Sequence, residues 1–196
     1  MIKRSDCTLV VIDVQDRIIE TISEYEAVVQ NVKALIKAFQ VLHVPVLSTE
    51  QEKLGKTVPD LAALLNKSPL IRKFSFSCYE PLELNRRLSE AQRRTAVICG
   101  IETHICVLQT VLDLLKNGYS VQVVRDAVSS HRIIDHETAL DRMKMSGAVM
   151  TTTEATIYEL TERAGTEEFR KILQIVKERR RFVDQGPRNP NKDVER

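Results

Sequence analysis

The chain has 196 residues, of which 43% are hydrophobic, and a formal net charge of +2. This length suits one domain with a sizeable core, and no apolar stretch is long enough for a signal peptide or a membrane span. Residues 177–196 hold seven Lys or Arg against four Asp or Glu, so the rest of the chain is nearly neutral and gives no argument for a nucleic-acid partner.

The four cysteines indicate a reducing compartment. Cys7, Cys78, Cys99 and Cys106 form no CxxC pair and show no zinc-ligand spacing, and Cys7 and Cys99 lie in apolar, strand-like runs. Reduced thiols are typical of the cytoplasm, where we expect the protein to reside.

Strand-like and helix-like segments alternate along the chain, without a repeat or a linker. Apolar and β-branched runs predict strands at Cys7–Gln15, Val44–Glu50, Pro69–Phe74, Arg94–Gly100, Ser120–Ala127 and Ala148–Thr153. Apolar residues at helical spacing predict helices at Ala27–Leu42, Val58–Asn66, Pro81–Gln92, Ile105–Lys116, Asp135–Met145, Glu154–Arg163 and Thr166–Arg181. Residues 1–181 are expected to form one domain, followed by a polar C-terminal arm at 182–196.

This alternation is typical of a three-layer α/β/α domain with a parallel sheet that is covered on both faces. Right-handed crossovers leave few topologies, of which we favour the doubly wound, Rossmann-like order 3-2-1-4-5-6. Strands 1 and 4 are then neighbours, and the chain reverses direction between them. Ligands bind outside the carboxyl ends of strands at such a switch point.

Two chemically active residues follow the strands that meet at this switch point. Asp13 ends strand 1, and Cys106 lies six residues after Gly100, where strand 4 ends. We expect Cys106 in the first turn of its helix, where unbonded N–H groups and the positive dipole end favour a thiolate. A nearby aspartate disfavours a second negative charge, so the pair needs a cation.

Lys73, at the end of strand 3, is the candidate cation. Strand 3 is two positions from strand 1, so on spacing alone a surface lysine is the alternative. His104 could pair with Cys106 instead, as in Cys–His nucleophiles, but residues two apart on a helix point to different faces. The other three histidines are scattered and form no metal-ligand cluster.

The segments around these residues resemble the three motifs of the isochorismatase-like cysteine hydrolases: VVIDVQ with Asp13, IRKFSFSC with Lys73 and GIETHICV with Cys106. The resemblance spans about residues 7 to 157, and the third motif is its most specific part. It implies that Cys106 is the nucleophile, that Asp13 takes its proton and later gives it to a leaving amine, and that Lys73 holds the two together.

The resemblance also implies details of the site around this triad. A cis peptide between Ile101 and Glu102 would direct the Glu102 N–H, together with that of Cys106, at an oxyanion. Gln15 would lie at the edge of the pocket. Loop position alone suggests further candidates for the substrate pocket, which are Gln51, Phe74, Phe76 and Cys78.

Departures from the family pattern narrow the expected chemistry. Nicotinamidases of this kind hold a divalent metal through an Asp and histidines after strand 2, but here that region reads STEQEKLGK, without histidine. We therefore expect no metal and no other cofactor, and nicotinamide is disfavoured as the substrate. Relatives that cleave isochorismate need no cysteine, so Cys106 favours hydrolysis of a small amide, imide or carbamoyl compound through a covalent acyl-enzyme.

Two other interpretations stay open at this point. One is a non-enzymatic α/β protein with a redox-sensing or structural Cys106, and the other is a nucleic-acid-associated protein that acts through the basic tail. We also expect a homo-oligomer, a dimer or larger, in which a neighbouring subunit binds the C-terminal segment. The helix at 166–181 carries an apolar stripe that must be buried, formed by Phe169, Ile172, Leu173, Ile175 and Val176.

Overall fold

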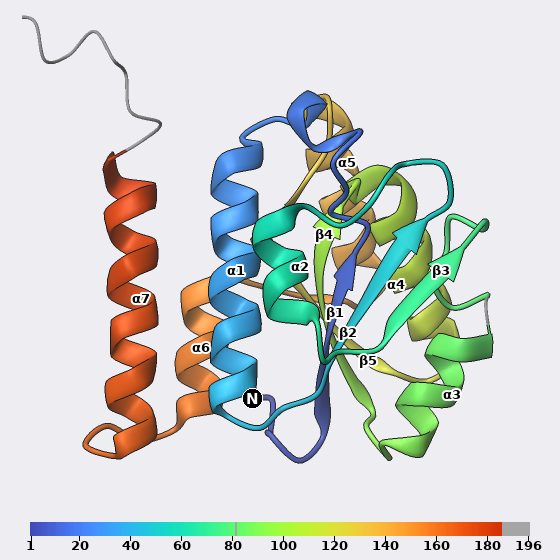
Figure 1. Ribbon diagram of the computed structural model, residues 1–196. Coiled ribbons are helices and arrows are strands. Elements are labelled where there is room, and N and C mark those ends of the chain that lie inside the picture. Colours follow the sequence, from blue (N-terminus) through green and yellow to red (C-terminus); the bar gives the residue numbers. More distant parts are fainter. Residues whose placement is uncertain (81, 186–196) are drawn as a thin grey trace, which may run out of the picture.

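A six-stranded parallel sheet lies at the centre of the computed structural model, which describes residues 1–80 and 82–185 (Figure 1). The strand order is β3-β2-β1-β4-β5-β6, so the predicted doubly wound topology is confirmed. The strands are β1 (Cys7–Ile12), β2 (Val46–Gln51), β3 (Leu70–Lys73), β4 (Thr95–Ile101), β5 (Ser120–Ser129) and β6 (Val149–Thr151). All five neighbouring pairs run parallel.

Helices cover both faces of this sheet, as the alternation of elements predicted. They are α1 (Tyr25–Val41), α2 (Pro59–Leu65), α3 (Leu82–Glu90), α4 (Leu108–Lys116), α5 (Ile133–Met145), α6 (Thr153–Thr161) and α7 (Glu167–Gln185). One buried cluster joins the sheet to α1, α2, α6 and α7, and a second joins its other face to α3, α4 and α5 (Figure 1). No helix among the described residues is long and apolar enough to cross a membrane.

The central strand β1 shows why two clusters form. Its residues are all buried, and they alternate between the faces: Leu9 and Val11 belong to the cluster around α1, while Val10 and Ile12 belong to the cluster around α4. This is the period-2 arrangement of a strand that is covered on both sides. Asp13 comes directly after this apolar run and therefore lies at the carboxyl edge of the sheet.

At that edge, the backbone of β1 leaves no room for a side chain at Gly100 of β4. Its φ is +118°, a region that disfavours residues with a side chain, and a Cβ atom here would lie 2.0 Å from the backbone oxygen of Ile12. The residue pairs with Ile12 in the β1–β4 register. A glycine is thus required where the chain passes from β4 toward the segment that carries Cys106.

The segment between β4 and α4 differs from the prediction. Residues Thr103–Val107 form a π-helical turn, and the α-helix begins only at Leu108 rather than at Ile105. Cys106 therefore lies in the π-helical turn and not in the first turn of an α-helix. Single π-helical turns of this kind occur frequently at functional sites.

The C-terminal helix is longer than the sequence predicted, and three of the five residues of its apolar stripe are buried within the chain. Helix α7 extends to Gln185, and residues 186–196 of the predicted arm lie outside the described residues. Ile172, Ile175 and Val176 join the cluster that includes α1. Since α1 of the same chain covers these three residues, they do not support the predicted oligomer.

Candidate active site

Asp13 lies buried at the carboxyl end of β1, with a left-handed backbone (φ 49°) that aspartate tolerates better than most residues. Its Oδ1 accepts a hydrogen bond of 2.6 Å from the hydroxyl of Thr49, the fourth residue of β2. Its Oδ2 lies 2.6 Å from the ammonium nitrogen of Lys73. Both carboxylate oxygens therefore have partners of complementary charge or polarity.

Lys73 reaches the centre of the site even though it ends the edge strand β3. Its side chain has no exposed surface, and its Nζ lies 2.6 Å from Asp13 Oδ2 and 2.7 Å from Gln51 Oε1. The backbone oxygens of Ser75 and Phe76 each lie 3.2 Å from the same nitrogen. Four acceptors thus surround an ammonium group that has three protons.

The charge of Lys73 is secured by its neighbours. Burial by itself lowers the pKa of this ammonium, but the negative charges that Cys78, Asp13 and Cys106 can carry more than offset that effect. The net result is a pKa above the ordinary lysine value. Lys73 therefore stays a cation, as the sequence-based hypothesis required of it.

Cys106 faces this ion pair from the π-helical turn. Burial, and then the negative charge of Asp13, raise the pKa of its thiol above the ordinary cysteine value, whereas Lys73 lowers it. Burial and the Asp13 charge therefore favour the protonated thiol over a resting thiolate.

A second thiol lies beside the same ion pair. Cys78 is fully buried, and its Sγ lies 3.7 Å from the hydroxyl oxygen of Thr49. Its backbone N–H donates a 2.9 Å hydrogen bond to the hydroxyl of Thr110, which in turn donates to the backbone oxygen of Cys106 at 2.6 Å. Thr110 thus joins the segment after Lys73 to the turn that carries the nucleophile candidate.

Among the other predicted site residues, Gln15 and Gln51 are buried and hydrogen-bonded, whereas Phe74 and Phe76 are exposed. Gln15 bonds to both backbone groups of Gln51, at 2.8 and 3.0 Å, and the Gln51 amide donates to the backbone oxygen of Phe74. The side chains of Phe74 and Phe76 are turned to solvent, at 77% and 53% exposure. They line a surface hollow with Gln109 and not the buried cluster around Asp13.

The segment before Cys106 is held in place by hydrogen bonds to the residues that follow β5. The peptide bond between Ile101 and Glu102 is cis. The Glu102 carboxylate accepts from the backbone N–H of His131 at 2.9 Å, and His104 Nδ1 lies 2.9 Å from the hydroxyl of Ser130. His104 is therefore bonded to the residue that follows β5.

The end of β2 offers polar groups that already have partners. Glu50 accepts from the backbone and hydroxyl of Thr57, and Gln51 bonds to Lys73. Within residues 1–80 and 82–185, no three His, Cys, Asp or Glu side chains are arranged to hold a metal ion.

Sequence reasoning missed Thr49 and Thr110. A signal for Thr49 was present, because β2 reads VLSTEQ and is buried along its whole length. Polar side chains in such a strand need hydrogen-bond partners, and Thr49 and Gln51 share one face. Thr110 gave no comparable signal, since a threonine in an amphipathic helix is unremarkable until its neighbours are known.

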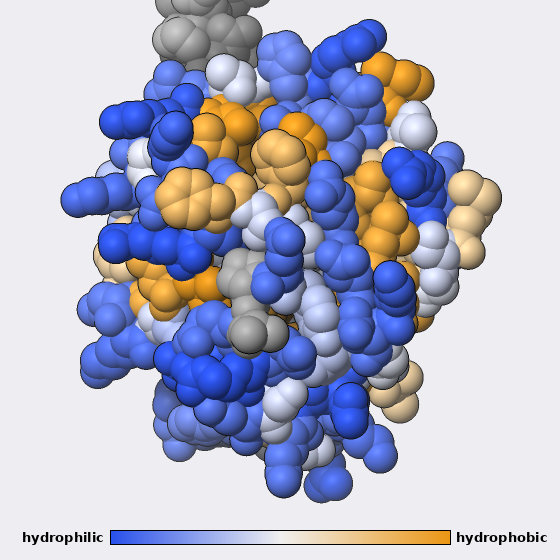
Figure 2. Space-filling model, turned by 90° about the vertical axis from the view of Figure 1, so that its right-hand side faces the viewer, coloured by the Kyte–Doolittle hydropathy of each residue, from blue (hydrophilic) through white to orange (hydrophobic). Residues whose placement is uncertain are grey.

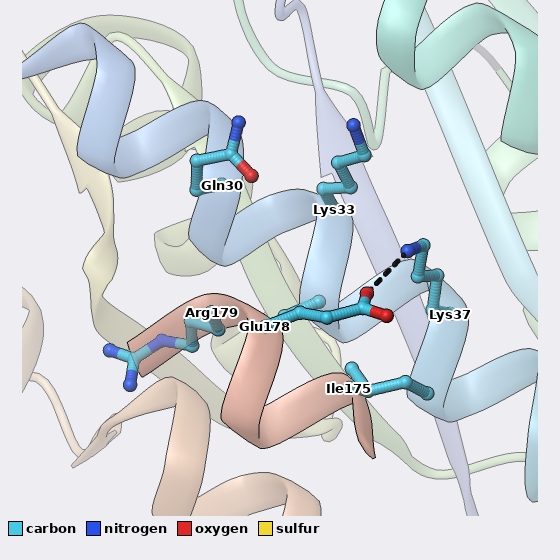
Figure 3. Close-up of a pocket in the computed structure, with 7 residues that line it drawn as sticks. Gln30, Lys33, Lys37, Ile175, Glu178 and Arg179 are labelled. Atoms are coloured by element: carbon cyan, nitrogen blue, oxygen red, sulfur yellow. Dashed lines mark hydrogen bonds and ion pairs between the residues drawn. The ribbon is translucent and has the colours of Figure 1, made fainter. Parts of the chain in front are cut away.

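Another hollow lies far from this cluster, between α1 and α7 (Figure 3). Lys37 is paired with Glu178 across it at 3.1 Å, and the charged ends of Lys33 and Arg179 are bound to carboxylates on α2 and β5. Because these cations are already neutralised, the hollow serves the packing of α7 onto α1 and offers no anion site.

The sequence profile of the isochorismatase domain matches residues 7–155. The chain belongs to the isochorismatase family. Among its relatives, the secreted isochorismatase effector Isc1 of Phytophthora sojae (strain P6497) is 40% identical over 177 residues, which cover 87% of this chain and 84% of that protein. The family assignment agrees with the resemblance seen in the three motifs.

Solved structures show the same fold. A structure titled MAR1 ribonuclease, from Caenorhabditis elegans, is 34% identical, with a TM-score of 0.83 over 90% of this chain and 92% of that one. The YcaC gene product from Escherichia coli, described as an octameric hydrolase of unknown specificity, is 21% identical, with a TM-score of 0.84 over 94% and 95% of the two chains. At that identity, the second likeness establishes the isochorismatase fold alone.

Proposed function

We propose that this isochorismatase-family protein is a cysteine hydrolase that cleaves a small amide, imide or carbamoyl compound without a metal. The observation that carries the proposal is a buried Asp13–Lys73 ion pair that lies close enough to the buried Cys106 thiol for both charges to shift the pKa of that thiol. A protonated cysteine beside a buried carboxylate is a nucleophile with its own base.

The proposed reaction has two halves, which balance in atoms and protons. In the first, Asp13 takes the proton of Cys106, the sulfur attacks the carbonyl carbon, and the C–N bond breaks as Asp13 gives that proton to the leaving nitrogen. A thioester on Cys106 and a free amine result. In the second, Asp13 takes a proton from water, which attacks the thioester, and Asp13 returns that proton to the sulfur as the C–S bond breaks and the acid product leaves.

Lys73 contributes charge and not a proton. Its ammonium is surrounded by four acceptors from the protein itself, so it has no donor to spare for a substrate. A fixed cation at this place stabilises the thiolate while Asp13 is protonated, and the carboxylate before and after. We assign the developing oxyanion to the backbone N–H groups of Glu102 and Cys106.

Metal independence is part of the proposal. It is supported by the engagement of Glu50 and Gln51 at the end of β2, where each side chain is bonded to another part of the protein. We expect turnover to be unchanged after treatment with a chelator such as EDTA, and loss of activity would overturn this part.

The decisive experiment screens small amides, imides and carbamoyl compounds and follows the protein by intact-mass spectrometry. We expect release of amine or ammonia and a mass increase equal to the acyl group, both absent in Cys106→Ala. Cys99→Ala is the matched control, because Cys99 is a buried thiol outside the site. Asp13→Asn should lower turnover by about 10²–10⁴-fold. Unimpaired turnover by Cys106→Ala would rule out covalent catalysis.

RNA is a second substrate class to include in the screen, because the structure from Caenorhabditis elegans carries the name of a ribonuclease. The geometry of this protein favours a small amide over RNA as the substrate of Cys106. Cys106 belongs to the cluster on the α4 face of the sheet, whereas the basic helix α7 packs on the opposite face. RNA cleavage that depends on Cys106 would replace the amidase proposal, and a site with neither activity would leave Cys106 as a redox or structural thiol.

We also propose a homo-oligomer in a reducing compartment. All four cysteines are free thiols, which suits the cytoplasm. Exposed apolar side chains lie on or next to the edge strand β3, at Leu70, Phe74 and Phe76, and Figure 2 shows apolar groups on this side of the molecule. Light scattering should give a mass above the monomer, and Phe74→Ser/Phe76→Ser should lower it. Deletion of residues 182–196 tests the contribution of the C-terminal segment.

A further inference from the structure

Two buried side chains beside Asp13 have no part in the proposed reaction. Thr49 lies on β2 and Cys78 on the segment that follows β3, and both are almost fully shielded from solvent. The hydroxyl of Thr49 lies 2.6 Å from Asp13 Oδ1, and the sulfur of Cys78 lies 3.7 Å from the same hydroxyl. The three groups form a row that ends on the carboxylate.

The direction of each hydrogen bond in this row is fixed by chemistry. An ionised carboxylate only accepts, so the single hydroxyl proton of Thr49 is donated to Asp13. The hydroxyl oxygen can then only accept from its other neighbour, and the Cys78 thiol is a donor. Burial raises the pKa of Cys78 to about 12, so that thiol keeps its proton at neutral pH.

We propose that Thr49 is a positioning residue for Asp13 and that Cys78 orients the Thr49 hydroxyl, so that the row Cys78, Thr49, Asp13 holds the carboxylate for proton transfer with Cys106. The inference rests on the proposed function, because it assumes that Asp13 exchanges a proton with the nucleophile. With Oδ1 held by Thr49, Oδ2 stays against Lys73 at 2.6 Å.

The Thr49 hydrogen bond should affect the two proton transfers of Asp13 in opposite directions. It stabilises the negative charge of the carboxylate and weakens when Asp13 becomes protonated. It therefore opposes the removal of the Cys106 proton and promotes its delivery to the leaving amine. Loss of the bond should shift the shared proton from Cys106 toward Asp13 and so increase the fraction of thiolate.

The segment that carries Cys78 is well placed to keep this row rigid. The Cys78 backbone N–H is bonded to Thr110, and the Thr110 hydroxyl is bonded to the backbone oxygen of Cys106. The nucleophile turn and the orienting thiol are thus tied to one side chain of α4. The titratable groups that act on Cys106 are Asp13 at the end of β1, Lys73 on β3 and Cys78 after it.

The test measures the rate of Cys106 alkylation by iodoacetamide against pH, by peptide mass spectrometry, and needs no substrate. Thr49→Val keeps the volume and removes the hydroxyl. We expect Cys106 of this variant to be alkylated about tenfold faster at neutral pH, where Asp13 and Cys106 share one proton, because a tenfold change in that equilibrium equals one pK unit. Thr49→Ser keeps the hydroxyl and should restore the wild-type rate at neutral pH. Cys78→Ala should raise that rate by a smaller factor.

Two outcomes would overturn the inference. One is a Thr49→Val protein that is folded by circular dichroism and is alkylated at the wild-type rate at neutral pH. The other, which applies where Thr49→Val does not fold, is a folded Cys78→Ala protein with the wild-type rate. If Cys106 proves inactive on every amide while the rate increase in Thr49→Val is present, the proposed function fails and the hydrogen-bonded row stands. With a substrate in hand, Thr49→Val should lower kcat and leave KM unchanged, since Thr49 touches no substrate.

Discussion

The ammonium nitrogen of Lys73 lies 2.6 Å from Oδ2 of Asp13, although β2 separates their two strands in the sheet. The long lysine side chain spans that strand at the carboxyl edge, and the backbone oxygens of Ser75 and Phe76 close around its charged end. Neither side chain is more than 2% exposed. Removing one partner of such a pair leaves the other as an uncompensated buried charge.

Lys73→Met should therefore destabilise the fold strongly. Methionine fills a similar space without the charge, and we expect the free energy of unfolding to fall by about 3–5 kcal/mol. Urea denaturation followed by circular dichroism measures the loss. Lys67→Met is the matched control, because Lys67 is exposed, and it should change stability by less than about 0.5 kcal/mol.

The double variant Asp13→Asn/Lys73→Met separates the charge from the packing. It removes both charges, so part of the stability lost in Lys73→Met should return. A double variant whose loss equals the sum of the two single losses would show that the ion pair is not an energetic unit.

Cys106 should be the first cysteine to react with a small alkylating agent. It is 5% exposed, whereas the other three thiols show no exposed surface. Brief treatment with iodoacetamide and peptide mass spectrometry should find the label on Cys106, and Cys106→Ser should leave the folded protein unlabelled over the same time. Earlier labelling of Cys7, Cys78 or Cys99 would show that the site is closed to reagents of this size.

The sheet order and the meeting of Asp13 with Cys106 were open to prediction because they depend on topology. In a doubly wound sheet, the residues that follow strands 1 and 4 must come together. The position of the Lys73 ammonium beside Asp13 could not be predicted from topology. It depends on the length of one side chain and on the carbonyl groups of the loop that follows it. The role expected of Lys73 came from the family resemblance and not from spacing.

The local backbone and the pairing of surfaces were harder to predict. Apolar spacing does not distinguish a π-helical turn from the first turn of an α-helix, so Cys106 was expected in the wrong kind of turn. The same spacing correctly found a buried stripe on α7 but could not show that α1 of the same chain covers it. Periodicity identifies a face and does not identify its partner.

Gly100→Ala should disturb the approach of β1 and β4 beside the site. The added Cβ would meet the backbone oxygen of Ile12, and backbone atoms cannot move aside as a flexible side chain can. Gly147→Ala is the matched control: its φ is +105°, and nothing lies within 4 Å of an added Cβ. Both variants strain the backbone, so we expect Gly100→Ala to cost about 1–3 kcal/mol more than the control. Equal losses would show that the close contact is unimportant.

The pH dependence of Cys106 alkylation should respond in opposite directions to the loss of its two charged neighbours. Because burial and then the charge of Asp13 raise the pKa of the thiol, the wild-type rate should be low at neutral pH and increase as pH rises. Asp13→Asn removes the opposing negative charge and leaves Lys73 beside the sulfur, so its midpoint should move to lower pH. Lys73→Met removes the favourable cation, so its midpoint should move to higher pH.

The Asp13→Asn variant also separates the effect of the Asp13 charge on the Cys106 thiol from the role of Asp13 in proton transfer. The variant should alkylate faster than wild type at neutral pH, since its thiolate is favoured, and yet fail to turn over an amide, since asparagine cannot carry the proton to the leaving nitrogen. A stopped assay of amine release, run beside the alkylation assay on one preparation, checks both halves. Slower alkylation in Asp13→Asn would mean that the carboxylate promotes thiolate formation as a base more than it opposes it by its charge. Retained turnover would remove Asp13 from the proposed proton transfer altogether.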